Sequence, residues 1–311
     1  MKKIITIIII GAIIIGGIYF LTKGSSVTIE GTTPQEGVVN GEDNTTTTPG
    51  TDEGATTTPD VVVDDTKTVI GASALGNDIT AYHYGNGDRD ILFVGGIHGG
   101  YSWNTSLVAY NLMDYLEANP NSIPNNVRVT VIPVMNPDGL EKVVGTTGSF
   151  TVGDVSSSES VKVSGRFNGN TVDLNRNFDC DWQSSATWQS RTVSGGSSAF
   201  SEPESLAIKT YIESNTPDAV VVYYSAAGGV FSSSCHNGVS SETRALTQVY
   251  AKASGYPAYE EFDFYEITGD MVNWLAKENI PAISVLLTNH TDVEWSKNRA
   301  GIEALFTHLS K

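Results

Sequence analysis

Four short runs of β-branched and aromatic residues, each leading directly into a loop rich in Gly, Asn or His, constrain the fold of this chain most strongly. These runs lie at residues 91–94, 127–134, 219–224 and 282–287. Apolar spacing predicts helices between them, at 105–117, from 201, at 242–253, at 270–278 and from 297 to near the end. Strands that alternate with helices predict an α/β fold with a mixed central sheet and helices on both faces.

The loops that follow these four strands hold most of the chemically informative residues. In open α/β sheets, ligands bind outside the carboxyl ends of the strands. The four loops contain Gly95-Gly96-Ile97-His98-Gly99, Asn136-Pro137-Asp138-Gly139, Ser225-Ala226-Ala227-Gly228 and Thr288-Asn289-His290. The sequence therefore predicts a ligand site at this edge of the sheet.

The N-terminal segment is an almost unbroken apolar run from Ile4 to Thr22. A helix of that length covers roughly the 30 Å hydrocarbon core of a bilayer. Because Lys2 and Lys3 precede the run, the positive-inside rule keeps the N-terminus in the cytoplasm and places the rest outside. We therefore expect residues 1–23 to be a membrane anchor. A cleaved signal peptide is the alternative, although its apolar region would be shorter.

The segment 24–68 is rich in Thr, Pro, Gly and acidic residues, with nine acids against the single Lys67. Such a composition buries too little apolar surface to offset chain entropy, so we expect a disordered stalk, with a glycosylated stalk as an alternative. Apart from Tyr19 and Phe20, all the aromatic residues lie in 69–311, which we expect to be one extracytoplasmic or extracellular domain.

The overall charge argues against one class of partner. The 311 residues include 35 acidic and 18 basic side chains, which gives a formal net charge of −17. Nucleic-acid binding depends on a basic surface that neutralises phosphates. We therefore expect no nucleic-acid partner.

Six motifs in residues 69–311 occur together and in order, which makes them specific as a set. They are Gly95-Gly96-Ile97-His98-Gly99, Asn136-Pro137-Asp138-Gly139, Arg166-Phe167-Asn168, Asp173-Leu174-Asn175-Arg176-Asn177-Phe178, Phe200-Ser201-Glu202-Pro203-Glu204, and Tyr265 with Thr268-Gly269 and Trp274. On these motifs the segment resembles the zinc carboxypeptidase family of the carboxypeptidase A type. The resemblance implies a zinc-dependent peptidase fold that acts at the C-terminal end of peptides.

The resemblance also implies one zinc held by two His and one Glu, with another Glu as general base. His98 matches the first ligand. Ser102 stands where the Glu ligand is expected, Tyr224 replaces the second His, and Leu286 replaces the general base. A catalytic zinc needs about three protein ligands and an open position for water, so we expect zinc binding to be weak or absent. His98 is then either a vestigial ligand or a loop histidine satisfied by the backbone.

A rebuilt metal site is the minority interpretation of the same sequence. It would need ligands at positions that differ from those of the family. The candidates for this role are His83, His236, His290, Asp292, Glu294 and Tyr224 as a phenolate.

The substrate-holding half of the site is retained. By the family motif, Asn175 and Arg176 clamp the free C-terminal carboxylate, Arg166 stabilises the oxyanion, and Tyr265 closes over the substrate. A planar guanidinium suits this task because it donates two parallel hydrogen bonds to a carboxylate. Structural ion pairs are the alternative role for Arg166 and Arg176.

The two cysteines, Cys180 and Cys235, follow the Asn-Arg motif and the 219–224 strand, respectively. In an oxidising compartment such a pair predicts a disulfide at the rim of the site. Two buried free thiols are the alternative.

Three functional hypotheses follow from these observations. The favoured one is a degenerate peptidase that binds peptides or cell-wall stem peptides by their free C-terminal carboxylate without cleaving them. The second is an active zinc metallocarboxypeptidase that releases C-terminal residues through a rebuilt metal site. The third is a structural surface module in which even Asn175 and Arg176 serve packing.

Overall fold

The computed structural model describes residues 66–311. The expected membrane anchor at 1–23 and residues 24–65 of the expected stalk lie outside this range. Thr68, the last residue of the expected stalk, lies within the first strand, β1. Among residues 66–311, none of the helices is both long enough and apolar enough to cross a bilayer.

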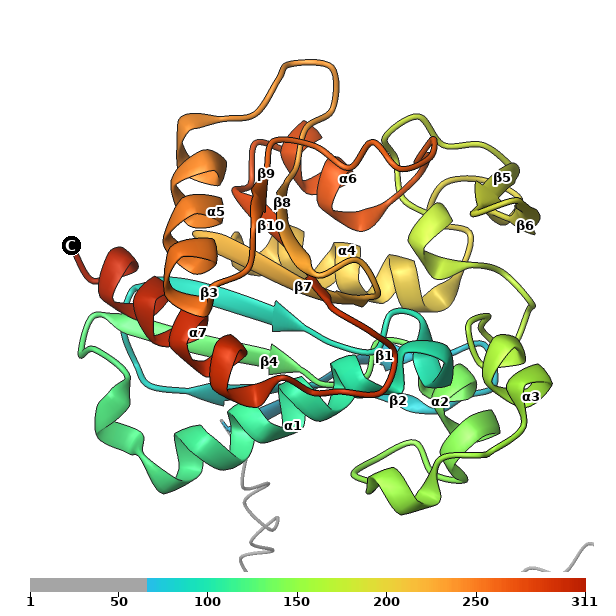
Figure 1. Cartoon of the computed structure of the whole chain (residues 1–311), viewed down its shortest axis with the longest axis horizontal. Helices are drawn as coiled ribbons and strands as arrows, with labels where there is room; N and C mark the ends of the chain where they lie inside the picture. The colour runs from blue at the N-terminus through green and yellow to red at the C-terminus, as the bar shows by residue number, and fades with distance from the viewer. Residues whose placement is uncertain (1–65) are drawn as a thin grey trace, which may run out of the picture. The chain divides into compact units, whose positions relative to one another are not determined.

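Eight strands form one mixed sheet in the order β1-β2-β4-β3-β7-β10-β8-β9 (Figure 1). They span Lys67–Ala72 (β1), Asp78–Tyr84 (β2), Arg89–Val94 (β3), Val127–Ile132 (β4), Ala219–Ser225 (β7), Gly229–Ser232 (β8), Ala258–Tyr259 (β9) and Ala282–Leu287 (β10). The four central strands are parallel, whereas β2 and β8 run antiparallel to their inner neighbours. A separate hairpin joins β5 (Ser185–Trp188) to β6 (Arg191–Ser194).

Seven α-helices accompany the sheet. They span Trp103–Ala118 (α1), Pro137–Val144 (α2), Glu159–Ser164 (α3), Pro203–Asn215 (α4), Ser241–Ser254 (α5), Met271–Lys277 (α6) and Trp295–Leu309 (α7). Figure 1 shows α1, α5 and α7 together on one side of the sheet, with α4 and α6 on the other. The predicted mixed sheet with helices on both faces is therefore confirmed.

The residue pattern of β3 explains why both faces are covered. Successive side chains of a strand point to opposite faces. Ile91 and Phe93 belong to the core under α1, α5 and α7, whereas Leu92 and Val94 belong to the core under α4 and α6. All four are fully buried, as the unbroken apolar run predicted.

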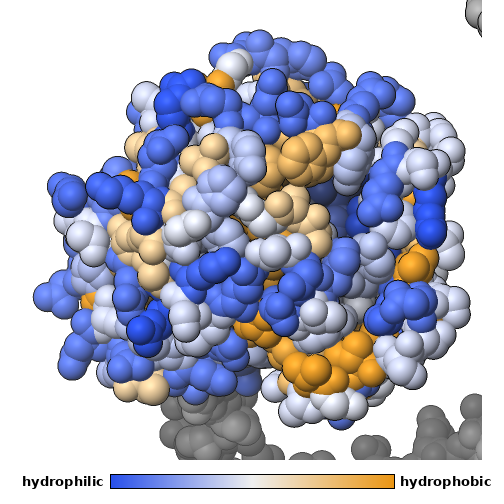
Figure 2. Space-filling model, in the orientation of Figure 1, coloured by the Kyte–Doolittle hydropathy of each residue, from blue (hydrophilic) through white to orange (hydrophobic). Residues whose placement is uncertain are grey.

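Figure 2 shows that the outer surface on this side is mostly hydrophilic, with hydrophobic side chains in small areas.

The four predicted central strands are present as β3, β4, β7 and β10. Three boundaries differ: β3 begins two residues earlier, at Arg89, β7 ends one residue later, at Ser225, and β4 ends at Ile132 and not at Val134. Pro133 follows Ile132 and has no backbone N–H to donate to a neighbouring strand. The outer strand β1 and the hairpin of β5 and β6 were not predicted, because they are short and partly exposed and so carry no continuous apolar run.

Candidate functional site

A cavity of about 480 Å³ lies at the carboxyl ends of the central parallel strands. Five of the sequence-predicted residues line it together, and so do two of the substituted positions. These are His98, Arg166, Asn175, Arg176 and Tyr265, with Tyr224 and Leu286. Ser102 does not line the cavity, although its backbone N–H reaches the His98 carbonyl over 3.5 Å. The fold therefore gathers motifs that are up to 190 residues apart in the chain.

His98 lies at the start of a short 3-10 helix, η1 (Gly99–Ser102), just beyond β3. Gly99 adopts a φ of +43°, and a Cβ there would lie 2.5 Å from the Gly165 carbonyl oxygen. Glycine is required at this position because a side chain would clash with that backbone. The tight turn places the His98 ring at the floor of the cavity.

The His98 ring is only 5% exposed, and neither ring nitrogen has a hydrogen-bond partner among the described residues. Its nearest acid is Asp173, with 3.6 Å between Nε2 and Oδ1. Burial, followed by the charges of Arg166 and Arg176, holds the pKa of His98 well below its usual value. The imidazole is therefore neutral at pH 7 and has a free lone pair.

The residues around His98 do not fit a zinc ion of the family type. Ser102 is buried, and its hydroxyl has no hydrogen-bond partner among residues 66–311. Burial raises the pKa of Tyr224 well above its usual value, so its hydroxyl stays protonated. Leu286 pairs with Tyr224 in the register of β10 and β7, and offers no ligand atom. A single neutral imidazole lacks the partner ligands that zinc sites use.

The rebuilt-metal candidates are dispersed in the structure. Of the candidates named for a rebuilt metal site, His290 and Tyr224 line the same cavity as His98, whereas His83, His236, Asp292 and Glu294 do not. His83 contacts Thr68 and Thr130 at the β2 side of the sheet, and Glu294 is engaged by Thr288, Tyr256 and Lys297. Within the described part of the chain, the one cluster of three potential metal-binding side chains is Cys180, Cys235 and His236, where the cysteines are joined as a disulfide.

Asp173 organises the retained half of the site. Its side chain is fully buried and accepts a hydrogen bond from the backbone N–H of Asn175. This bond caps the start of the 3-10 helix η4 (Leu174–Arg176). The same carboxylate accepts hydrogen bonds from Nε and Nη2 of Arg166, each over 2.8 Å. Arg166 also stacks on Trp188, with the guanidinium carbon 4.3 Å from a ring centroid. Arg166 is thus a paired, rigidly held cation.

Arg176 differs from Arg166 because it has no acidic partner within ion-pair distance in residues 66–311. Its Nε and Nη2 donate to the Thr187 carbonyl over 3.1 and 2.9 Å, and its Nη1 donates to the Asn175 carbonyl. The side chain is 1% exposed and lines the cavity. A guanidinium has five N–H donors, so two remain for a ligand. Asp270, which lines the same cavity, acts on Arg176 through its charge but forms no ion pair with it. A buried cation without an ion-pair partner favours the binding of an anion.

The amide of Asn175 is oriented by two donors to its oxygen. Its Oδ1 accepts the Tyr224 hydroxyl over 3.0 Å and the Met271 backbone N–H over 3.2 Å. The other end of the amide is then Nδ2, which has no hydrogen-bond partner among the described residues. It is available at the cavity wall beside Arg176. Tyr265 is partly exposed at the rim, where its ring packs edge-on against Phe262 at 5.1 Å.

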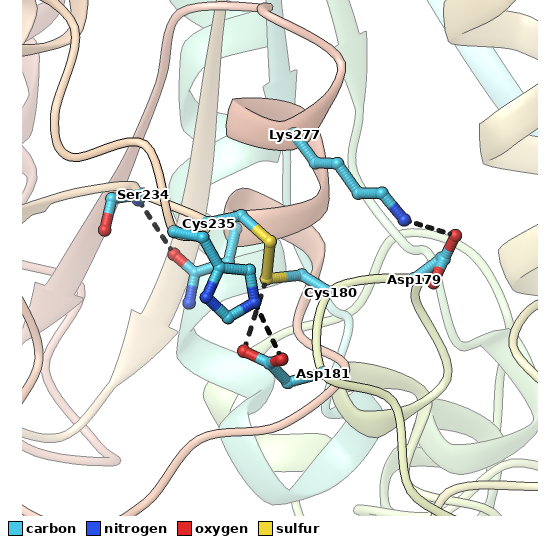
Figure 3. The surroundings of a disulfide bond; sticks show 8 residues. Asp179, Cys180, Asp181, Ser234, Cys235 and Lys277 are labelled. Carbon is cyan, nitrogen blue, oxygen red and sulfur yellow. Dashed lines mark hydrogen bonds and ion pairs between the residues drawn. A yellow bond between two sulfur atoms is a disulfide. The ribbon is translucent and has the colours of Figure 1, made fainter.

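The predicted disulfide between Cys180 and Cys235 is confirmed, with the two Cα atoms 6.1 Å apart. It joins the segment after η4 to the loop after β8, where neighbouring Ser234 lines the cavity. Figure 3 shows the bond with the ion pair of Lys277 and Asp179 nearby. His236 Nε2 lies 2.9 Å from Asp181 Oδ1 on the residues that adjoin the two cysteines. The disulfide thus fixes two loops beside the site.

Sequence reasoning did not single out Trp188 or Asp270 as parts of the site, whereas Ser225 lies in one of the four loops where a ligand site was predicted. Trp188 lies in the unpredicted hairpin, and Asp270 lies at the start of α6. Burial raises the pKa of Asp270 to about 6, despite the opposing charge of Arg176. The Oδ1 atom of Asp270 has no hydrogen-bond partner among the described residues. The signal in the sequence was its position directly after Thr268-Gly269, at the start of the predicted helix 270–278.

Comparisons with solved structures identify the fold. The murein-tripeptide amidase MpaA from Escherichia coli O157 aligns with a TM-score of 0.53 at 19% identity, over 79% of this chain and 92% of that one. Bovine thrombin-activatable fibrinolysis inhibitor, solved with tick carboxypeptidase inhibitor, aligns with a TM-score of 0.61 at 16% identity, over 78% of this chain and 88% of that one.

Curated relatives match over shorter parts of their length. Gamma-D-glutamyl-L-diamino acid endopeptidase 1 from Lysinibacillus sphaericus is 25% identical over 217 residues, which cover 64% of this chain and 54% of the relative. Human carboxypeptidase D is 34% identical over 98 residues, or 30% of this chain and 6% of the relative. The chain thus spans about half or less of the relatives it matches. The sequence profile described as zinc carboxypeptidase matches residues 52–294, most of the chain, so this protein belongs to the zinc carboxypeptidase family.

Proposed function

We propose that this protein is a degenerate member of its family that binds peptides by their free C-terminal carboxylate and does not cleave them. The observation that carries the proposal is the buried guanidinium of Arg176, which lines the cavity without an acidic partner in residues 66–311. A bound carboxylate forms the ion pair that Arg176 lacks. It also accepts hydrogen bonds from the remaining N–H groups of Arg176 and Asn175. Hydrolysis is lost because Ser102, Tyr224 and Leu286 replace the residues that would hold zinc and activate water.

Cell-wall stem peptides are the ligand class that we favour. The names of two similar proteins, a murein-tripeptide amidase and a gamma-D-glutamyl-L-diamino acid endopeptidase, support this choice. We also propose that residues 1–23 anchor the chain and that the domain lies outside the cytoplasm. The disulfide of Cys180 and Cys235 supports an oxidising compartment. Membrane extraction tests the anchor. The full chain should be extracted only with detergent, whereas the chain without residues 1–23 should need no detergent.

Calorimetric titration of the intact protein tests carboxylate binding. The probes are N-acetyl-Ala-Ala, in its L,L and D,D forms, and the matching C-terminal amides. We expect binding of an acid and no binding of its amide. Arg176→Ala should weaken binding of the acid by about 100-fold, because truncation of one partner of a buried charge pair costs several kcal/mol. Arg299→Ala, at an exposed position of α7, is the matched control and should bind as the unchanged protein does.

Each alternative predicts a different outcome. Equal affinity for acid and amide, or unchanged affinity in Arg176→Ala, would indicate the structural module. The active-peptidase alternative gains support from the unpartnered nitrogens of His98. Stoichiometric zinc in the purified protein, together with chelator-sensitive release of C-terminal residues, would establish that alternative instead.

A further inference from the structure

The orientation of the Asn104 amide is fixed by the carbonyl groups that surround it. Asn104 lies in the first turn of α1 and is fully buried. One end of its amide lies 2.8 Å from the Asn289 carbonyl oxygen and 3.0 Å from that of Asp292. Carbonyl oxygens only accept hydrogen bonds, so this end must be the Nδ2 donor. The Oδ1 end therefore faces Ser225, whose hydroxyl oxygen is 3.2 Å away.

This orientation determines where the Ser225 proton points. The hydroxyl is the one donor to Asn104 Oδ1 among the described residues, and a buried carbonyl without a donor is costly. Ser225 has a single hydroxyl hydrogen, and this hydrogen forms the bond to Asn104 Oδ1. His290 Nδ1 lies 2.9 Å from the same hydroxyl oxygen. With its hydrogen engaged, Ser225 can only accept from this nitrogen, so His290 carries its proton on Nδ1.

The other ring nitrogen of His290 is consequently an acceptor. Nε2 has no hydrogen-bond partner in residues 66–311, and the side chain lines the cavity. The ring packs against Tyr101 at 4.5 Å between centroids, and Tyr101 packs against Trp188, which stacks on Arg166. His290, Tyr101 and Arg166 therefore belong to one wall of the cavity.

The loop that holds His290 is itself tightly fixed. Asn289 Oδ1 accepts the backbone N–H groups of Thr291 and Asp292, over 2.8 and 2.7 Å. Asn289 Nδ2 donates to the Asp292 carboxylate over 2.7 Å. The imidazole is thus held in place from both sides, by its own loop and by Ser225.

The charges around His290 keep it in the neutral form. Burial and Arg166 lower its pKa from the usual value, Lys162 adds to that effect, and Glu159 opposes it. These two side chains come from α3 and pair with each other. At pH 7 the ring is therefore uncharged, so the single proton on Nδ1 leaves Nε2 with its lone pair.

We propose that His290 is a positioning residue whose Nε2 accepts a hydrogen bond from a peptide N–H of the bound ligand. The inference rests on the proposed binding of a C-terminal carboxylate. With that carboxylate at Arg176 and Asn175, the next polar groups of a peptide are its N–H and C=O. The guanidinium of Arg166 can only donate, so it suits the C=O, whereas the N–H needs an acceptor such as His290 Nε2.

Depsipeptides test this assignment, because an ester oxygen replaces one N–H without changing the carboxylate. The probes are N-acetyl-Ala-Ala, the analogue with an ester between the last two residues, and the analogue with an ester in place of the acetyl amide. In the unchanged protein we expect one ester analogue to bind about 10-fold more weakly than the peptide. His290→Asn can still donate to Ser225 but has no acceptor at the Nε2 position, so the difference should shrink to about 2-fold.

His290→Gln, which places a carbonyl oxygen near the Nε2 position, should restore part of the discrimination. His236→Asn, at the exposed disulfide, is the control and should discriminate as the unchanged protein does. Protonation of His290 at acid pH turns the acceptor into a donor, so the discrimination should also disappear well below pH 6.

The outcomes separate this inference from the proposed function. If the acid still binds better than its amide but His290→Asn leaves both ester discriminations unchanged, the role of His290 is wrong and carboxylate binding stands. If the unchanged protein does not distinguish either ester from the peptide, the role of His290 is also wrong. If neither the peptide nor the esters bind, both proposals are overturned.

Discussion

The Tyr224 hydroxyl donates a hydrogen bond of 3.0 Å to Asn175 Oδ1, and so links the position where the family resemblance led us to expect a zinc ligand to the proposed carboxylate clamp. Because the pKa of Tyr224 is raised by burial, the phenol stays neutral and keeps its donor. The bond helps to turn Asn175 Nδ2 toward the cavity. The substitution therefore places a hydrogen-bond donor for the clamp where the family would hold metal.

Tyr224→Phe should weaken ligand binding more than it affects the fold. Loss of this bond frees the Asn175 amide to rotate, so we expect about 5-fold weaker binding of N-acetyl-Ala-Ala. The free energy of unfolding should fall by about 1 kcal/mol. Calorimetry and urea denaturation measure the two effects. Tyr115→Phe, which removes the bond to Glu303, should lower stability alone. Unchanged affinity in Tyr224→Phe would contradict the link.

Asp270→Asn should stabilise the protein at neutral pH. The folded-state pKa of about 6 lies above the usual 3.8, so the folded protein binds this proton more tightly than the unfolded chain does. The contribution of Asp270 to stability is therefore lost as pH rises from 3.8 through about 6. At pH 7 the penalty amounts to about 3 kcal/mol at most. Asn is also favourable at the helix N-cap that Asp270 occupies.

Denaturation of Asp270→Asn and of the unchanged protein between pH 4 and pH 8 measures this effect. The two proteins should be closest in stability at pH 4 and should diverge as pH rises. A stability difference that does not vary with pH would show that Asp270 ionises normally.

Replacement of both Cys180 and Cys235 by Ser should destabilise the domain substantially. The disulfide closes a loop of 55 residues, for which chain-entropy estimates give about 4 kcal/mol. Urea denaturation of the double variant, and of the unchanged protein with and without a reducing agent, measures the loss. The variant should not respond to the reducing agent. A loss below about 1 kcal/mol would mean that the two loops are held by their other contacts.

Restoration of the family ligands should create a zinc site. The triple variant Ser102→Glu, Tyr224→His and Leu286→Glu supplies two carboxylates and an imidazole around His98. We expect this variant to take up about one zinc per chain and to release C-terminal residues from peptides. Tyr224→His alone is the control, because it lacks both carboxylates. Equal zinc content in the unchanged protein would show that these positions were assigned wrongly.

The central part of the fold was predictable because its signals are local. The strands β3 and β7 are continuous apolar runs, since both faces of the sheet are covered. The outer strands carry weaker signals: β1 is largely exposed and pairs with β2, and β9 has only two residues. Their pairing depends on neighbours that the sequence pattern does not reveal.

By itself, the sequence determined which functional groups are present. His98, Asn175 and Arg176 are recognisable from motifs, and the sequence predicts Ser102, Tyr224 and Leu286 at the positions of the family ligands and general base. These are statements about residue type and spacing, and they need no three-dimensional structure.

Only the tertiary structure decided how those groups are paired. Arg166 and Arg176 look equivalent in sequence, yet Asp173 neutralises the first and leaves the second without a partner in residues 66–311. The tautomer of His290 depends on Asn104 and Ser225, which lie 186 and 65 residues away in the chain. The physical reason is that charge compensation and hydrogen-bond direction depend on which groups lie close together in three dimensions, and a linear pattern does not contain that proximity.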